Sequence, residues 1–323
     1  MLLKQFLTAV TAPLARRQPG ISTMRLSLEI SSLGQFLPWG VHLDSFQLEG
    51  MAAEWIKPDK ADPSRVLLYL HGGGYVLGSL NTHRSLVGAL AQRCGLHALA
   101  IDYRKAPEYP FPAALEDALL AYRWLLRQGY RPHDIIVAGD SAGGGLALAL
   151  LLALRDGQEP LPAAAIGLSP WTDLVLPTAT IRKVAHEELQ FLEALAIRGW
   201  GGQYAGTAPL TEPLVSPVRA SLHELPPLLL QTSDAEVLYD DVLTFAAKAR
   251  IAGVPVTLQT FAGLVHWWHL FWRVLPEART ALDQVASFTN GIWAAQEAAA
   301  QVVLAARTSA KRIKPDVRLR ARL

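Results

Sequence analysis

Cysteine is nearly absent from this sequence: Cys94 is the single cysteine among 323 residues. One thiol excludes an internal disulfide and suits a reducing compartment, which favours a cytoplasmic protein. A lone cysteine is most often a small buried hydrophobic residue, and we expect Cys94 to be one rather than a reactive thiol.

Long apolar runs are absent as well. The longest, residues 142–154, is well short of the roughly 20 residues that cross a bilayer, so we expect no membrane insertion. The first 20 residues carry Lys4 inside their apolar run and lack a clear basic region before it. An amphipathic helix rather than a signal peptide is therefore predicted, because apolar residues recur there at helical spacing: Leu3, Phe6, Leu7, Val10 and Leu14.

Positive charge is in only slight excess over negative charge. The formal net charge is only +2, so the field of the whole molecule gives no reason to expect nucleic acid as a partner. Charged residues make up 18% and hydrophobic residues 51%, which is typical of a globular protein with a large core. Residues 307–323 are strongly basic, with Asp316 as their single acid, and we predict a solvated, partly disordered tail there. An electrostatic docking arm is the alternative.

Short apolar segments rich in β-forming residues alternate with helical patterns along most of the chain. Strands are predicted at 65–71, 96–103, 134–140, 163–169, 227–233 and 254–261, and helices at 114–128, 142–155, 240–252 and from about 276. Such alternation predicts an α/β fold, with a mostly parallel sheet covered by helices on both faces. Residues 1–45 and 174–215 show no clear strand, and the second region interrupts the alternation as an inserted lid would. We predict a single domain, 1–323.

A serine follows the predicted strand 134–140 in the pattern G-x-S-x-G, formed by Gly139, Asp140, Ser141, Ala142 and Gly143. At a strand–turn–helix junction this pattern holds the serine on a sharp turn with its hydroxyl above the sheet. The flanking glycines are needed because a β-carbon would collide with the neighbouring strand and helix. Ser141 is the predicted nucleophile.

Three glycines in "YLHGGGYVLGS" follow the predicted strand 65–71. They let successive backbone amides turn toward one point, which would stabilise the oxyanion of a tetrahedral acyl intermediate. Phosphate binding is the competing interpretation, but the Lys-Ser/Thr of a P-loop and the G-x-G-x-x-G spacing are both missing. His71 is expected to anchor this loop by hydrogen bonds.

These motifs together resemble the hormone-sensitive-lipase family of α/β-hydrolases. The resemblance rests on His71–Gly74, "DYRKAPEYPFPAALEDA" from Asp102, "GDSAGG" and "SPWTDL", in order and at matching spacing over residues 65–275. It implies an eight-stranded sheet, a helical cap built from about 1–45 and 174–215, and ester hydrolysis without a cofactor or metal. By motif, the oxyanion donors would be the amides of Gly73, Gly74 and Ala142. The resemblance is strongest to bacterial acetyl-type esterases and monoterpene lactone hydrolases, and it is compatible with a homodimer.

The base is expected just past the last strand, in "FAGLVHWWHLF". The order Ser…Asp/Glu…His of α/β-hydrolases places a histidine there. The family pattern, a glycine, two residues and then the histidine, selects His266 over His269. Trp267 and Trp268 replace the usual Gly-Phe after that histidine, which changes the shape of the adjoining pocket.

Four carboxylates crowd the segment "TSDAEVLYDD" where the acid partner of the histidine is expected. The family usually has Asp-x-Leu-x-Asp here. Aligned without a gap, the pattern puts Glu236 where the aspartate is usual. Asp234 is of the expected residue type but would require a slip of two residues. We favour Glu236 and keep Asp234 as the alternative. Asp240 and Asp241 are interpreted as first-turn residues of the next helix.

The sequence therefore predicts a carboxylesterase for short- to medium-chain acyl esters, with the triad Ser141, Glu236 and His266. Aromatic residues near the predicted site would form a compact apolar cleft for a small-molecule ester, with Trp39, Trp171, Trp267 and Trp268 as candidates. A lactone hydrolase of small cyclic esters is the alternative, since it needs the same residues. A non-catalytic small-molecule binding protein is a remote alternative, because both Ser141 and His266 are present.

Overall fold

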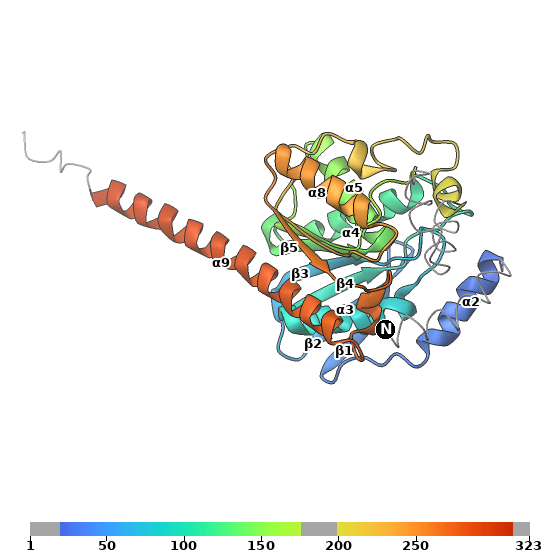
Figure 1. Ribbon diagram of the computed structural model, residues 1–323. Coiled ribbons are helices and arrows are strands. Elements are labelled where there is room, and N and C mark those ends of the chain that lie inside the picture. The colour runs from blue at the N-terminus through green and yellow to red at the C-terminus, as the bar shows by residue number, and fades with distance from the viewer. Residues whose placement is uncertain (1–19, 176–198, 313–323) are drawn as a thin grey trace, which may run out of the picture.

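Eight strands and the helices between them form the part of the chain that the computed structural model describes, residues 20–175 and 199–312 (Figure 1). The strands are β1 (Val41–Leu48), β2 (Met51–Pro58), β3 (Asp62–Leu70), β4 (Leu96–Ile101), β5 (Ile135–Asp140), β6 (Ala164–Leu168), β7 (Leu228–Ser233) and β8 (Val256–Phe261). The helices are α2 (Ile21–Ser32), α3 (Leu80–Cys94), α4 (Ala113–Arg127), α5 (Ser141–Asp156), α8 (Tyr239–Ile251) and α9 (Pro276–Arg312), with the 3-10 helices η1 (Pro132–Asp134), η2 (Pro217–Arg219) and η3 (Trp268–Phe271). Every strand and helix predicted by the alternation is present within a few residues of its expected bounds.

All eight strands belong to one sheet, in the order β1-β2-β4-β3-β5-β6-β7-β8. The pairs from β4 through β8 are parallel, whereas β2 is antiparallel to both of its neighbours, β1 and β4. The prediction of a mostly parallel α/β sheet is confirmed. Because parallel strands end at the same edge, the loops after β3, β5, β7 and β8 converge on that edge, where α/β proteins bind their ligands.

Alternate residues of each central strand pack into clusters on opposite faces of the sheet. In β3, Leu68 and Leu70 are fully buried in the cluster that includes α4 and α5, whereas Leu67 and Tyr69 are buried in the cluster that includes α3 and α9. Figure 1 shows α4, α5 and α8 over one face of the sheet and α3 with the start of α9 over the other. Burial on both faces explains why these strands are near-continuous apolar runs.

The hairpin of β1 and β2 lies where the sequence shows no alternation of strands and helices. In β1 only Val41 and Leu48 are buried, so the strand carries few of the apolar residues by which a strand is recognised. Its turn is made by Glu49 and Gly50, with φ of 51° and 94°, as a two-residue hairpin loop of positive φ requires. The sheet thus begins at Val41, inside the segment 1–45 that is predicted to form the cap.

The predicted cap segments fall partly outside the described residues, at 1–19 and 176–198. In the described part, α2 packs against α3. Arg25 anchors α2 by donating to the carbonyl oxygens of Val76 (2.7 Å) and Ala106 (2.8 Å) and to the carboxylate of Glu108 (2.8 Å). These contacts attach α2 to the loops at the carboxyl edge of the sheet, while the cap as a unit stays a prediction.

The helix α9 begins against the body of the protein and projects away from it (Figure 1). Its 37 residues correspond to a length of about 55 Å. The first part packs on α3 and η3, and the last buried side chain described in it is Trp293. The helix continues to Arg312, into the segment predicted as a basic tail; residues 313–323 lie outside the described part. Among the helices described, none combines the length and apolar character needed to cross a membrane.

Candidate active site

Ser141 lies on the sharp turn between β5 and α5. Its φ of 50° is in the left-handed region, which residues other than glycine adopt only under local constraint. Gly143 allows the turn to sit close to β3, because a β-carbon at Gly143 would meet the carbonyl oxygens of Leu70 and His71. The turn therefore presents the serine at the carboxyl edge of the sheet, where the G-x-S-x-G spacing predicts it.

A continuous chain of hydrogen bonds joins Ser141 to the loops after β7 and β8. Nε2 of His266 lies 2.8 Å from Oγ of Ser141, and Nδ1 of His266 lies 2.9 Å from Oε2 of Glu236. Because an ionised carboxylate only accepts hydrogen bonds, Nδ1 carries the proton and Nε2 is left to accept from the serine hydroxyl. The side chains of His266 and Glu236 are 5% and 0% exposed, so little water competes for these contacts.

The remaining carboxylates of the segment 232–241 lie elsewhere. Asp234 is exposed, and its Oδ1 accepts from the amide of Gly263 at 2.7 Å, which ties the loop after β7 to the loop before His266. Asp240 and Asp241 lie in the first turn of α8, as expected. Of the four carboxylates, the structure brings Glu236 to the imidazole.

The loop after β3 presents three glycines beside the serine. Gly73 and Gly74 have φ of 122° and 63°, which favour glycine, and a β-carbon at Gly74 would collide with the ring of Trp200. Within the described part of the chain, no acceptor is hydrogen-bonded to the amides of Gly73 and Gly74. The amide of Ala142 lies in the first turn of α5, where helical amides have no partner of their own. This is the arrangement that an anion hole needs.

Asp140, the variable residue of G-x-S-x-G, holds this loop against the turn that carries Ser141. Its Oδ1 accepts from the hydroxyl of Tyr69 (2.8 Å) and the amide of Gly72 (2.9 Å), and Nε2 of His83 lies 3.2 Å from its Oδ2. Burial raises the pKa of this carboxyl, but the charge and hydrogen bond of His83 and the hydroxyl of Tyr69 outweigh burial and lower the pKa to about 2. The carboxylate is therefore ionised and fixed.

His71 anchors the glycine loop from below. Its Nδ1 donates to the carbonyl of Gly72 at 2.8 Å, and its ring stacks on Tyr103 with centroids 4.3 Å apart. The hydroxyl of Tyr103 donates to the carbonyl of His71 at 2.7 Å. Burial lowers the pKa of His71 from its ordinary value. The ring serves as a structural support for the glycine loop rather than as a base.

Two of the tryptophans lie close to the serine or the glycine loop. Trp171 is fully buried, its amide donates to the carbonyl of Ser141 at 2.8 Å, and its indole N–H donates to the carbonyl of Asp173 at 2.9 Å. Trp200, an aromatic residue of the predicted inserted lid, packs on Gly74 and borders the glycine loop from that region, as aromatic residues around a cleft would.

The other candidate pocket residues lie in different surroundings. Trp39 is 95% exposed, and its carbonyl accepts from Gln92, near the end of α3 that is remote from the glycine loop. The structure therefore does not bring Trp39 to Ser141. Trp268 is fully buried, so it has no free surface for a substrate. Trp267 is half-buried with φ of 62°, directly after His266.

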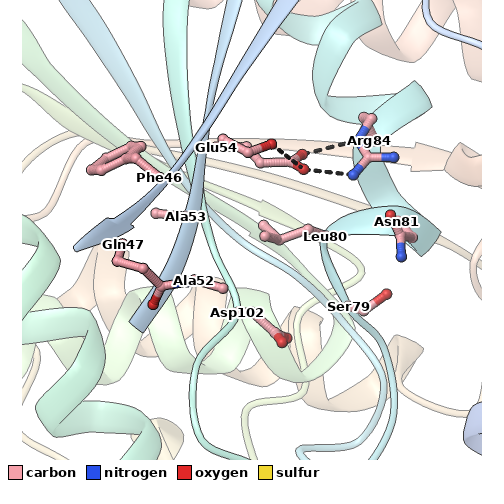
Figure 2. Close-up of a pocket in the computed structure, with 11 residues that line it drawn as sticks. Phe46, Gln47, Ala52, Ala53, Glu54, Ser79, Leu80, Asn81, Arg84 and Asp102 are labelled. Carbon is pink, nitrogen blue, oxygen red and sulfur yellow. Dashed lines mark hydrogen bonds and ion pairs between the residues drawn. The ribbon is translucent and has the colours of Figure 1, made fainter. Parts of the chain in front are cut away.

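A cavity of about 490 Å³ opens beside this site but does not include it (Figure 2). Figure 2 shows Glu54 and Arg84 next to each other in its wall, joined by hydrogen bonds, the longer of 2.9 Å. Its wall also holds Asp102, whose Oδ1 lies 3.5 Å from Nε2 of His71. The cavity thus lies behind the anchor of the glycine loop, and Ser141 does not line it.

Comparison with known proteins gives the same family as the motifs. Residues 67–270 match the family described as alpha/beta hydrolase fold. The chain is 49% identical over 239 residues to an acetyl-hydrolase of Streptomyces hygroscopicus, covering 73% of this chain and 78% of that protein. It is 37% identical over 253 residues to an esterase of Acinetobacter venetianus, covering 78% and 83%.

Solved structures agree in fold and in sequence. The crystal structure of an esterase from the bacterial hormone-sensitive lipase family superposes with a TM-score of 0.80 at 39% identity, over 84% of this chain and 91% of that one. A likeness in sequence and fold over most of both chains establishes more than a shared architecture. The chain belongs to the hormone-sensitive-lipase family of α/β-hydrolase esterases and is a carboxylic ester hydrolase.

Proposed function

We propose that this protein is a carboxylesterase for short- to medium-chain acyl esters that works through a Ser141–His266–Glu236 triad. The observation that carries the proposal is the chain of hydrogen bonds from Oε2 of Glu236 (2.9 Å) through His266 to Oγ of Ser141 (2.8 Å). A serine next to a base that a third group orients has the arrangement of an activated nucleophile.

In acylation, Oγ of Ser141 attacks the ester carbonyl carbon while Nε2 of His266 takes the hydroxyl proton. The negative charge on the carbonyl oxygen is stabilised by the amides of Gly73, Gly74 and Ala142, each contributing roughly a hundred- to thousand-fold in rate. Glu236 keeps the proton on Nδ1 and stabilises the imidazolium. His266 then gives its proton to the departing alkoxide, which leaves as the alcohol.

In deacylation, a water molecule takes the place of the alcohol. Nε2 of His266 removes a proton from this water, whose oxygen attacks the acyl carbon, and the same amides hold the second oxyanion. Collapse of this intermediate returns the proton to Ser141 and releases the acid. Atoms balance with water as the only co-reactant.

The proposed acyl size rests on the aromatic side chain beside the glycine loop. The ring of Trp200 is half-buried and lies against Gly74. A bulky ring at this place favours a short acyl group over a long lipid chain. The acetyl-hydrolase to which the chain is similar agrees with a short acyl substrate. The cytoplasm is the proposed compartment, since Cys94 is a buried free thiol.

Initial hydrolysis rates on p-nitrophenyl esters from acetyl to dodecanoyl test the proposal, with the Ser141→Ala variant as the blank. We expect the highest kcat/KM at short acyl chains and no enzymatic turnover in the variant. A maximum at the longest chains would contradict the proposed acyl size, and full activity of Ser141→Ala would contradict the triad. Activity confined to small lactones would favour the lactone hydrolase instead.

A further inference from the structure

We propose that Trp268 is a positioning residue that acts on the base through the carboxylate of Glu236. The inference rests on the proposed triad and extends it by one residue. Nε1 of the Trp268 indole lies 2.9 Å from Oε1 of Glu236, and the ring is completely buried. A buried tryptophan whose N–H meets a carboxylate can fix the direction of that carboxylate.

The two oxygens of Glu236 have separate partners. Oε1 accepts from the indole of Trp268, the hydroxyl of Ser169 (2.7 Å) and the amide of Ser233 (3.1 Å). Oε2 faces Nδ1 of His266. The three donors on Oε1 prevent the carboxylate from rotating about its terminal bond, so Oε2 is presented to the imidazole in one orientation. Hydrogen bonds to a charged acceptor are the stronger class, which makes this constraint effective.

Trp268 is itself held rigidly. Its ring stacks on His269, with centroids 3.7 Å apart, and packs on Phe261 at 4.6 Å. Burial lowers the pKa of His269 to about 3, so this neighbour is neutral. Nε2 of His269 lies 3.1 Å from Oε1 of Gln231, whose amide donates to the carbonyl of Ala281 at 2.9 Å. The indole is thereby fixed between β7, β8 and α9.

The burial of Trp268 excludes direct contact with a substrate, and its hydrogen bond gives it a specific indirect role. The side chain has no exposed surface and therefore cannot contact a substrate. Its one polar atom is used on Glu236. A residue that only filled space would not need an indole N–H aimed at a carboxylate, because a phenyl ring would pack as well without leaving a buried donor unsatisfied.

The test is a double-mutant cycle between Trp268→Phe and Glu236→Ala, with kcat and KM measured on p-nitrophenyl acetate. We expect Trp268→Phe to lower kcat about ten-fold with KM unchanged, since a hydrogen bond to a charged group is lost. In the Glu236→Ala background the same substitution should change kcat by less than about two-fold, because the group it orients is gone.

Trp272→Phe is the matched control. Trp272 is in the same core cluster and also uses its indole N–H, which donates to Oγ of Ser85 at 3.2 Å rather than to Glu236. We expect it to retain the kcat of the wild type. If Trp268→Phe folds poorly, benzothienylalanine introduced at position 268 provides the same ring shape without the N–H, and the same loss of kcat is expected.

The outcomes separate the two proposals. Full activity of Ser141→Ala would remove the triad and the role of Trp268 with it. If Ser141→Ala and Glu236→Ala are both inactive while Trp268→Phe and the benzothienylalanine variant keep the wild-type kcat, the role of Trp268 alone is refuted. The role of Trp268 would also be refuted if Trp268→Phe lowered kcat equally with and without Glu236, or if Trp272→Phe lowered kcat as much as Trp268→Phe. Either result would mean that the substitution loosens the core in general.

Discussion

Glutamate is one methylene longer than aspartate, and the loop after β7 accommodates this length by folding Glu236 back onto its own strand. Oε1 accepts from the amide of Ser233, three residues earlier, while Oε2 reaches His266. Asp234 faces Gly263 instead and closes the loop. Glu236 and Trp268 are also two positions where the sequence departs from the usual family pattern, and in the structure the two side chains meet in one hydrogen bond.

Substitution of the two acids should therefore have different effects. Glu236→Gln is expected to lower kcat about a thousand- to ten-thousand-fold, because an amide cannot hold the same tautomer of His266 or stabilise its cation. Asp234→Asn should change kcat little, since the amide oxygen can still accept from Gly263. Steady-state kinetics on a short p-nitrophenyl ester measure both. A severe loss in Asp234→Asn with an active Glu236→Gln would mean that the acid is Asp234.

Asp241 is a buried carboxyl that the triad does not use. Burial, and then the charges of Asp173 and Asp240, raise its pKa to about 8, against the partial compensation of Arg219. Its Oδ2 has no hydrogen-bond partner among the described residues. The folded state thus keeps a proton that the unfolded state loses near its ordinary pKa. Stability from this group is complete below that value and is lost as the pH rises toward 8.

Asp241→Asn is expected to raise the melting temperature at pH 8 and to have a smaller effect at pH 5. At pH 5 the wild-type carboxyl is already neutral in the folded protein, so the amide gains less. Thermal unfolding of both proteins in buffers of equal ionic strength measures the difference. Asp44→Asn, at an exposed strand position, serves as a control: its difference in melting temperature from the wild type should not grow between pH 5 and pH 8. A difference that stays constant or shrinks between pH 5 and pH 8 would contradict the raised pKa.

At the scale of elements, the close approach of α5 to β3 is what positions Ser141, the proposed nucleophile. The backbone of Gly143 meets the carbonyl oxygens of Leu70 and His71, and no side chain can enter there. Features of this kind can be predicted from the sequence, because the spacing of glycines and the apolar runs follow directly from the backbone conformation. The turn at Ser141, the glycine loop and the central strands could be predicted for that reason.

Features that depend on distant residues were not predictable. The hairpin of β1 and β2 is half-exposed and carries little pattern. Trp39 turns to the surface because the preceding residues, Leu37 and Pro38, pack against Gly88 of α3. No local sequence motif predicts this contact. The burial of Trp268 depends in the same way on β7, β8 and α9 coming together.

Gly143→Ala should therefore destabilise the protein strongly. A β-carbon would force α5 away from β3, at a cost typical of overpacking, about 1–3 kcal/mol or more. Gly202 lies among the helical residues 199–205 and has open space around its α-carbon, so Gly202→Ala should be neutral or stabilising by up to about 1 kcal/mol. Urea unfolding of the two variants gives the comparison. Equal stability of both would show that the turn can relax around a methyl group.

At the scale of the whole molecule, the first part of α9 packs on the body of the protein, whereas the described side chains of its outer part are exposed. Trp293 is buried, and Glu297 pairs with Arg65 at 2.6 Å, whereas residues 298–302 are exposed. Stability is expected to come from the part of the helix that packs on α3 and η3. Residues 298–302, the outer part of α9 whose side chains are described, have no described contact with the site.

Removal of residues 298–323 should accordingly leave kcat, KM and the melting temperature of the esterase unchanged. Activity on a short p-nitrophenyl ester and thermal unfolding of the shortened chain measure this directly. Trp293→Ala in the full-length protein is the contrasting variant, and it should lower stability by about 3–5 kcal/mol because a large buried side chain is lost. A large loss of activity on truncation would show that the end of the chain acts on the site.

The projecting helix also determines how the protein moves through solution. A compact domain of this length has a radius of gyration of about 20 Å, and α9 alone is about 55 Å long. Drag rises with the largest dimension, so a single chain should elute from a sizing column ahead of its mass of 35.2 kDa, toward the position of a dimer. Light scattering at the elution peak measures the true mass. The chain that lacks residues 298–323 should elute later than the full chain, and the delay should exceed the one expected from its smaller mass alone.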